Sequence, residues 1–147
     1  MNRRRNDDSG TVLLLVVGLA AVAIGLVIAV SDATVLYLGR RSVAAAADAT
    51  ALAAAQGADL AAVYAGRASV GLPLSAAAAR TASSQFVSDA GLPAALPGFR
   101  LESVVTDGRS VRVVVSAPIR LPFAGLIAKG NGVVTVRAAA RAMAPLH

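Results

Sequence analysis

Side chains that could carry out acid–base or metal chemistry are few in this chain of 147 residues. It has eight Asp and Glu residues, one His and no Cys. The His is the last residue, His147, and a chain terminus suits neither a buried base nor a metal ligand. Without Cys there is no thiolate nucleophile, disulfide or zinc–cysteine site. No two carboxylates form a recognisable metal site either, so the sequence predicts no bound metal.

Motifs for other enzyme classes are also missing. A serine hydrolase would need a GxSxG-type turn and a His that could be buried, and the sequence offers neither. Gly125, Gly130 and Gly132 do not follow the spacing of a phosphate-binding P-loop. We therefore expect a protein that is not an enzyme and that needs no cofactor.

The net charge of +6 raises the question of nucleic-acid binding. Of the 14 basic residues all but Lys129 are Arg, and they are dispersed along the chain. Aromatic residues make up only 3% of the chain, so bases would find few stacking partners. An N-terminal basic cluster and scattered surface arginines account for the charge, and we expect no nucleic-acid partner.

An uncharged run, Thr11 to Val30, dominates the N-terminal part of the chain. Its sequence, TVLLLVVGLAAVAIGLVIAV, contains no charged residue, Asn, Gln or Pro. As a helix it would cover roughly 30 Å, the thickness of the hydrocarbon core of a bilayer. A core helix of a soluble domain would carry polar residues on one face, and this run has no such face. The run predicts a transmembrane helix over residues 11–30.

A cleaved signal peptide is the alternative interpretation of this run. Arg3, Arg4 and Arg5 would form its positive n-region, and Ala29-Val30-Ser31 would provide small residues before a cut at Asp32. The apolar part of a signal peptide is about 7–15 residues long, however, and this run is longer. Its length favours a retained anchor; the alternative is a secreted soluble binding protein that has lost its N-terminus.

The basic residues near the run predict its orientation. Arg3 to Arg5 lie before it, whereas Arg40 and Arg41 lie about ten residues beyond it. The positive-inside rule therefore puts residues 1–10 in the cytoplasm as a short leader. Residues 31–147 would form an extracytoplasmic domain of a single-pass protein of the cell membrane.

Residues 31–91 are predicted to be helical and rich in Ala. From Ser31 to about Ala55 there is no Pro and one Gly, so the transmembrane helix should continue outward as a rod. A helix end and a new cap are predicted at Gln56-Gly57-Ala58-Asp59, followed by helix over Leu60 to Ala68. A thin apolar stripe lies along the rod, and a sheet or neighbouring subunits must cover it; it consists of Val35, Leu38, Ala45, Ala49 and Leu52.

A loop at Val70-Gly71-Leu72-Pro73 separates this rod from a second predicted helix. Ser75 should cap that helix, which would run to about Asp89 and end at Gly91. Its inner face would consist of Ala79, Ala82, Phe86 and Ala90.

Residues 92–147 are predicted to form a small antiparallel β region after a linker at Leu92 to Gly98. A first strand is predicted from Phe99, where Phe99, Leu101, Ser103 and Val105 alternate against Arg100, Glu102, Val104 and Thr106. Asp107-Gly108 predicts a two-residue hairpin with positive φ at both residues, followed by a strand over Arg109 to Ala117.

The remaining β region contains two prolines. Pro118 to Phe123 should be extended but poor for central sheet pairing. Ala124 to Lys129 should form a short helical turn, and Asn131-Gly132 a second turn before a strand over Val133 to Ala142. The fold class is therefore α+β, with a long N-terminal helix, a helical middle and a C-terminal three-stranded meander.

Three parts of the N-terminal half resemble a known family. Asp8-Ser9-Gly10 precedes the apolar run, Asp32 and Arg40 follow it, and Ala44 to Ala55 reads AAAADATALAAA. This pattern resembles the TadE/TadG-like proteins of the Flp (tight adherence) pilus and secretion apparatus, in particular the short actinobacterial ones. The resemblance is specific over about residues 8–56.

The resemblance implies a pilin-like fold and a role as a minor pseudopilin or accessory component in Flp/Tad pilus assembly or secretion. Its partners would be other components of that apparatus, with homo- or hetero-oligomers formed through the N-terminal helix. Gly10 and Thr11 would flank a candidate processing site, although Leu15 stands where many relatives carry Glu. Candidate partner contacts are Asp32, Asp48, Ala45, Ala49 and Leu52.

Both acidic candidates also have a purely structural interpretation. Asp32 follows the apolar run by two residues and would mark the water interface. Asp48 would be a solvated position of the Ala-rich helix.

Overall fold

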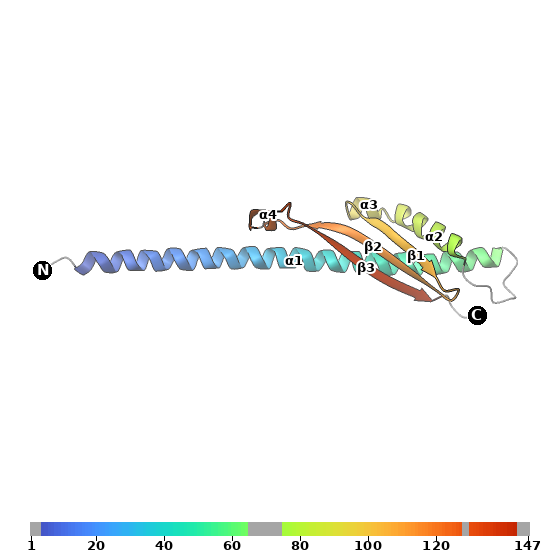
Figure 1. Ribbon diagram of the computed structural model, residues 1–147, viewed down its shortest axis with the longest axis horizontal. Helices are drawn as coiled ribbons and strands as arrows, with labels where there is room; N and C mark the ends of the chain where they lie inside the picture. The colour runs from blue at the N-terminus through green and yellow to red at the C-terminus, as the bar shows by residue number, and fades with distance from the viewer. Residues whose placement is uncertain (1–3, 65–74, 128–129, 144–147) are drawn as a thin grey trace.

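The computed structural model describes residues 4–64, 75–127 and 130–143. One long helix, α1 (Arg4–Tyr64), runs through the whole molecule, and a three-stranded sheet packs on its C-terminal half (Figure 1). A shorter helix, α2 (Ala76–Asp89), packs beside the same half of α1. The predicted α+β class, with its long N-terminal helix and C-terminal sheet, is confirmed.

The sheet is an antiparallel meander in the order β1 (Arg100–Thr106), β2 (Ser110–Arg120) and β3 (Val133–Met143). In β2, Val111, Val113, Val115 and Ala117 are buried, and they alternate with side chains on the outer face. This spacing of two residues is what one covered face requires; Ser110 and Ser116, at the intervening positions, are buried as well. The third strand, predicted at Val133 to Ala142, is confirmed with one further residue.

The core lies between this sheet, α2 and one face of α1. That face carries small residues, so the sheet backbone lies close to the helix; the buried ones are Val43, Ala46, Ala47, Ala51, Ala54 and Ala55. Thr50 is also buried, and its hydroxyl donates to the Ala46 carbonyl at 2.7 Å. Its polar group is therefore satisfied within the helix.

The sheet does not cover the apolar stripe that the sequence predicts. Leu38, Ala45, Ala49 and Leu52 are exposed, and only Val35 is half-buried. In a run with Ala on every side, periodicity gives no contrast between faces, and the two leucines drew the prediction to a face that the sheet leaves open. The covered face is the one that allows the closest backbone approach.

The predicted helix end at Gln56 to Asp59 is wrong, because α1 continues unbroken to Tyr64. A Cβ on Gly57 would lie 2.5 Å from the Cβ of Ala82 in α2. Gly57 therefore serves close helix packing and does not end the helix. The rest of the predicted Leu60 to Ala68 helix beyond Tyr64, and the loop at Val70 to Pro73, lie outside the described residues.

The predicted cap of α2 is confirmed. The Ser75 hydroxyl accepts a hydrogen bond from the Ala78 amide at 3.4 Å, and Gly91 follows the helix with a φ of 62°. Of the predicted inner face, Ala79 is buried, Ala82 and Phe86 are half-buried, and Ala90 is exposed. A short helix, α3 (Leu92–Ala95), occupies the predicted linker.

Ser83 completes the inner face of α2, although the sequence interpretation left it out. It is fully buried, and its hydroxyl donates to the Ala79 carbonyl at 2.7 Å. This bond removes the cost of burying a hydroxyl.

Two details of the β1–β2 hairpin differ from the prediction. A bulge between Leu101 and Ser103 shifts the register, so Val104 is buried while Ser103 and Val105 are exposed. Of the described residues only glycines have positive φ, so Gly108 (89°) adopts it and Asp107 does not. The turn is therefore a three-residue loop braced by the Asp107 side chain, and not a two-residue hairpin turn.

Pro118 lies within β2, opposite Thr135 of β3. The pairing of β2 with β1 already ends at Arg100 and Ser116, so Pro118 has a neighbouring strand on one side only. An edge position of this kind tolerates a residue without an N–H. After β2, α4 (Ala124–Ile127) confirms the predicted helical turn over its described part, and Gly132 (φ 63°) forms the predicted second turn.

Candidate functional site

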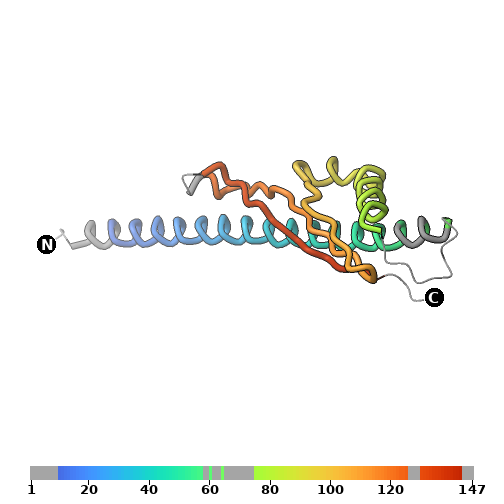
Figure 2. The backbone as a smooth tube through the Cα atoms, turned by 45° about the vertical axis from the view of Figure 1, so that its right-hand side comes forward, coloured from blue at the N-terminus to red at the C-terminus, as the bar shows by residue number. Residues whose placement is uncertain are grey.

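The N-terminal half of α1 projects beyond the sheet (Figures 1 and 2). Within the described residues, one helix is long and apolar enough to cross a membrane, over Gly10–Gly57. None of its most apolar stretch is buried by the described part of the chain. The exposed large side chains here include Val12, Leu13, Leu14, Leu15, Leu19, Val22, Ile24 and Leu26. An apolar surface of this extent marks contact with lipid or with another protein.

Asp32 joins this apolar stretch to the sheet domain. Its Oδ1 accepts a hydrogen bond from the backbone N–H of Phe123 at 3.0 Å, across 91 positions of sequence. Both residues are half-buried. Asp32 therefore fixes the connection between β2 and β3 to α1 at the point where the apolar run ends.

Two turns further along α1, Gly39 lies against Ile119 near the end of β2. A Cβ on Gly39 would be 2.8 Å from Cδ1 and Cγ1 of Ile119. The absence of a side chain lets β2 cross α1 closely, which brings the following connection within reach of Asp32.

The other candidate partner residues lie together on the face of α1 that points away from the core. Ala45, Asp48, Ala49 and Leu52 are all exposed, and Leu52 has 52% of its surface accessible. At about 100° per residue they share one side of the helix. Asp32 is separate from them, because it faces the β2–β3 connection.

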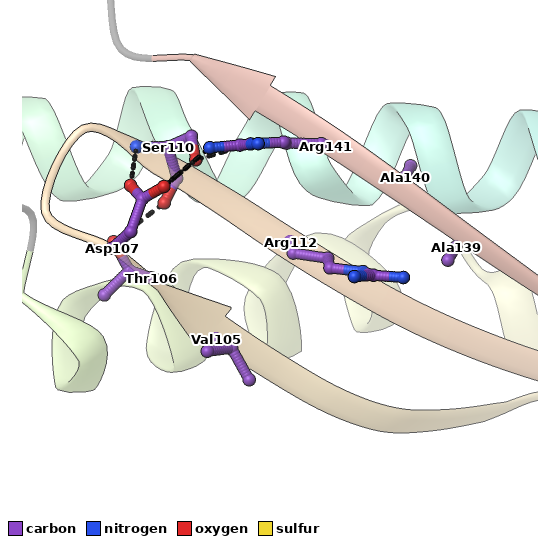
Figure 3. A pocket seen from close by; sticks show the side chains of 8 residues that line it. All are labelled: Val105, Thr106, Asp107, Ser110, Arg112, Ala139, Ala140 and Arg141. Atoms are coloured by element: carbon purple, nitrogen blue, oxygen red, sulfur yellow. Dashed lines mark hydrogen bonds and ion pairs between the residues drawn. The ribbon is translucent and has the colours of Figure 1, made fainter.

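A shallow depression lies on the outer face of the sheet, at its Asp107 end (Figure 3). The Asp107 carboxylate accepts hydrogen bonds from the amides of Arg109 and Ser110, from the Ser110 hydroxyl, and from Arg141 at 2.6 Å. The two amides, the hydroxyl and the Arg141 charge hold the pKa of Asp107 well below its usual range. An acid that stays ionised and has four donors braces the turn; it is not suited to donate a proton.

A second ion pair crosses the same face from β3 to β1. Arg137 Nε lies 2.7 Å from Glu102 Oε2, and the Ser116 hydroxyl together with Arg137 lowers the pKa of Glu102. The Arg137–Glu102 pair ties β3 to β1 across β2, and the Asp107–Arg141 pair ties β3 to the β1–β2 turn.

Potential metal ligands are dispersed over the described residues, and the candidate processing site lies in the exposed part of α1. In residues 4–64, 75–127 and 130–143, no group of three or more His, Cys, Asp and Glu side chains could hold a metal ion. Gly10 and Thr11 lie within α1, and both are exposed.

The sequence interpretation did not find Phe123, Ile119 or the role of Gly39. The Asp32–Phe123 pairing spans 91 positions and the Gly39–Ile119 pairing 80, and no local period reports such contacts. The one available signal was Pro118 and Pro122, which indicate an extended segment but not what it lies against.

Comparison with known proteins gives no relative: no family model matches the chain, and no match was found among curated proteins or solved structures.

Proposed function

We propose that this chain is a single-pass membrane protein with a short cytoplasmic N-terminus and an extracytoplasmic α+β domain. The observation that carries the proposal is the uncovered apolar half of α1, which continues without a break into the core of the folded domain. In a bilayer the apolar side chains of this helix contact lipid and not water, so their exposure costs no free energy. The Arg3 to Arg5 cluster supports the orientation.

The length of the apolar helix supports retention of the anchor over cleavage, because Thr11 to Val30 is longer than the apolar region of about 7–15 residues in a signal peptide. In the structure this segment is regular helix, and Ser31 and Thr34 donate to the carbonyls of Val27 and Val30, each at 2.8 Å. Asp32 is also engaged by Phe123. The secreted soluble binding protein remains the competing function.

For the molecular role we propose a TadE/TadG-like minor pseudopilin or accessory component of Flp/Tad pilus assembly or secretion. The residues that resemble the family, and the placement of a meander on the outer half of one long helix, support this role. The protein would act by helix packing and protein–protein contacts, without a cofactor or a catalytic step. Its partners would be other components of the same apparatus, or further copies of itself.

The test is to fractionate cells that express the full chain and to measure the intact mass of the product. A full-length protein that resists carbonate extraction supports the proposal, and so does a membrane-bound form starting at Thr11, which would add prepilin-like processing. A soluble form starting near Asp32 would establish the secreted alternative and overturn the anchor.

A further inference from the structure

The connection between β2 and β3 contacts α1 at the end of the apolar run, through Phe123. Asp32 follows the last residue of that run, Val30, by two positions, and it accepts the Phe123 amide at 3.0 Å. Figure 1 shows α4 projecting past the sheet toward the N-terminal end of α1, and Figure 2 shows the same from another side. If α1 spans a bilayer as proposed above, this connection lies at the outer membrane surface.

The first part of the connection is apolar. Leu121 to Ala128 reads LPFAGLIA and contains no charged residue. Of its described side chains none is fully buried: Leu121, Phe123 and Ala124 are half-buried, and Pro122 is exposed. An apolar segment that the domain covers only in part suits the interfacial region of a bilayer.

The base of the connection is held in shape and carries positive charge. The Leu121 amide donates to the Gly132 carbonyl at 2.8 Å, which closes the connection on itself. Arg120 precedes it, is exposed, and ends β2. An apolar tip with Arg at its base fits the boundary between acyl chains and anionic headgroups.

We propose that Leu121 to Gly125, the start of the connection, is a second membrane contact, which enters the headgroup region of the outer leaflet beside α1. It rests on the proposed function, because only a spanning α1 puts Asp32 at the membrane surface. The Asp32–Phe123 hydrogen bond sets its depth, and Arg120 meets lipid phosphate. Two attachment points, helix and segment, fix the tilt of the sheet domain relative to the membrane.

The absence of Cys allows a direct test on the full chain with single cysteines. Gly125→Cys suits the probe, since Gly125 is exposed and its Cβ would meet atoms no closer than 3.8 Å. Pro122→Cys, also exposed, is a second probe of the same segment. Ala77→Cys is the matched control, because Ala77 is an exposed position of α2. Helix α2 packs on α1 at Gly57, which follows Asp32 by 25 positions. Along the axis of α1, Gly57 is therefore roughly 38 Å further from the membrane than Asp32.

Each variant is labelled with an environment-sensitive fluorophore and reconstituted in vesicles of phosphatidylethanolamine and phosphatidylglycerol that contain headgroup spin-labelled lipid. We expect quenching at Gly125 and Pro122 to be at least about threefold that at Ala77. A Leu19→Cys probe with acyl-chain spin label reports the span itself. If the Leu19 probe is quenched but the Gly125 and Pro122 probes are quenched no more than Ala77, the helix spans the bilayer and the segment does not contact it. This result would overturn the second contact alone. An unquenched Leu19 would overturn the span, and the second contact with it.

Discussion

Gly57 of α1 and Ala82 of α2 approach so closely that a Cβ on Gly57 would lie 2.5 Å from the Cβ of Ala82. Real Cβ atoms do not come this close, and neither atom is at the end of a flexible side chain. A Gly57→Ala substitution must therefore push α2 away from α1. Alanine gains about 1 kcal/mol of helix propensity, but overpacking costs about 1–3 kcal/mol.

We expect Gly57→Ala to lower the free energy of unfolding by about 1 kcal/mol, measured by urea denaturation of the detergent-solubilised chain. Ala82→Gly is the matched partner, because it removes the atom in the way. In the double variant the two effects should couple favourably by at least about 1 kcal/mol. Strictly additive effects would show that the two helices do not meet at this point.

Asp32→Ala should loosen the β2–β3 connection from α1. The substitution leaves the half-buried Phe123 amide without its acceptor, at a cost of about 1–3 kcal/mol. Asp32→Asn keeps an acceptor oxygen and should lose less. Hydrogen exchange of the Phe123 amide is the measurement, with faster exchange in the Ala variant. Equal protection in the wild type and the Ala variant would show that the bond does not hold the connection.

The hydrogen bonds that Asp107 accepts in the β1–β2 turn should make the free energy of unfolding depend on pH. The folded pKa of this carboxyl is lowered from its ordinary value of 3.8, by the Arg109 and Ser110 amides, the Ser110 hydroxyl and the charge of Arg141. A lowered folded pKa means that the contribution is complete above the ordinary value and is lost as pH falls below it. The gap in unfolding free energy between wild type and Asp107→Asn should be constant from about pH 7 to 5 and narrow below about pH 4.

Denaturation of both proteins across this range is the measurement, and Glu102, whose pKa is also lowered, is present in both. Its titration therefore cancels in the difference. A gap that stays constant down to the lowest pH would mean that Asp107 does not act through its charge.

Local signals in the sequence were enough for the element types. Twenty uncharged residues predict a helix of membrane length, a Ser before an Ala run caps α2, and Gly108 and Gly132 mark turns where φ is positive. Each depends on a few neighbouring residues. The strands of the meander followed from alternation and from the turns at Gly108 and Gly132.

Contacts between distant elements were not predictable in this way. Gly57 looked like a helix end, because a Gly that stops a helix and a Gly that admits a neighbouring helix are the same residue. The bulge in β1 reverses the alternation, so that Val104 is buried. The residue types of β1 do not predict this bulge. In α1, Ala on all sides left the buried face undetermined until the sheet was placed against Val43 and Ala47.

Residues 44–55 contribute both to the core and to the exposed face of α1 that carries candidate partner contacts. A variant in which this whole range is scrambled would therefore lose the core together with the exposed face. The structure allows the two to be separated. Ala45 and Ala49 are exposed, so Ala45→Arg should change the unfolding free energy by no more than about 0.5 kcal/mol. It would nevertheless place a long charged side chain on the surface proposed to pack against another subunit.

We therefore expect a single Ala49→Cys variant to form crosslinked dimers or adducts with another membrane protein in intact cells, and Ala45→Arg to reduce this crosslinking at least about tenfold, as a loss of 1.4 kcal/mol would. Ala77→Cys on α2 is the control for exposure alone, and it should not crosslink. Equal crosslinking from Ala49 and Ala77, or yields at Ala49 that Ala45→Arg leaves unchanged, would show that this face of α1 meets only solvent. Because the core residues Ala46 and Ala47 stay intact in every variant, a loss of crosslinking would report on the outer face and not on unfolding.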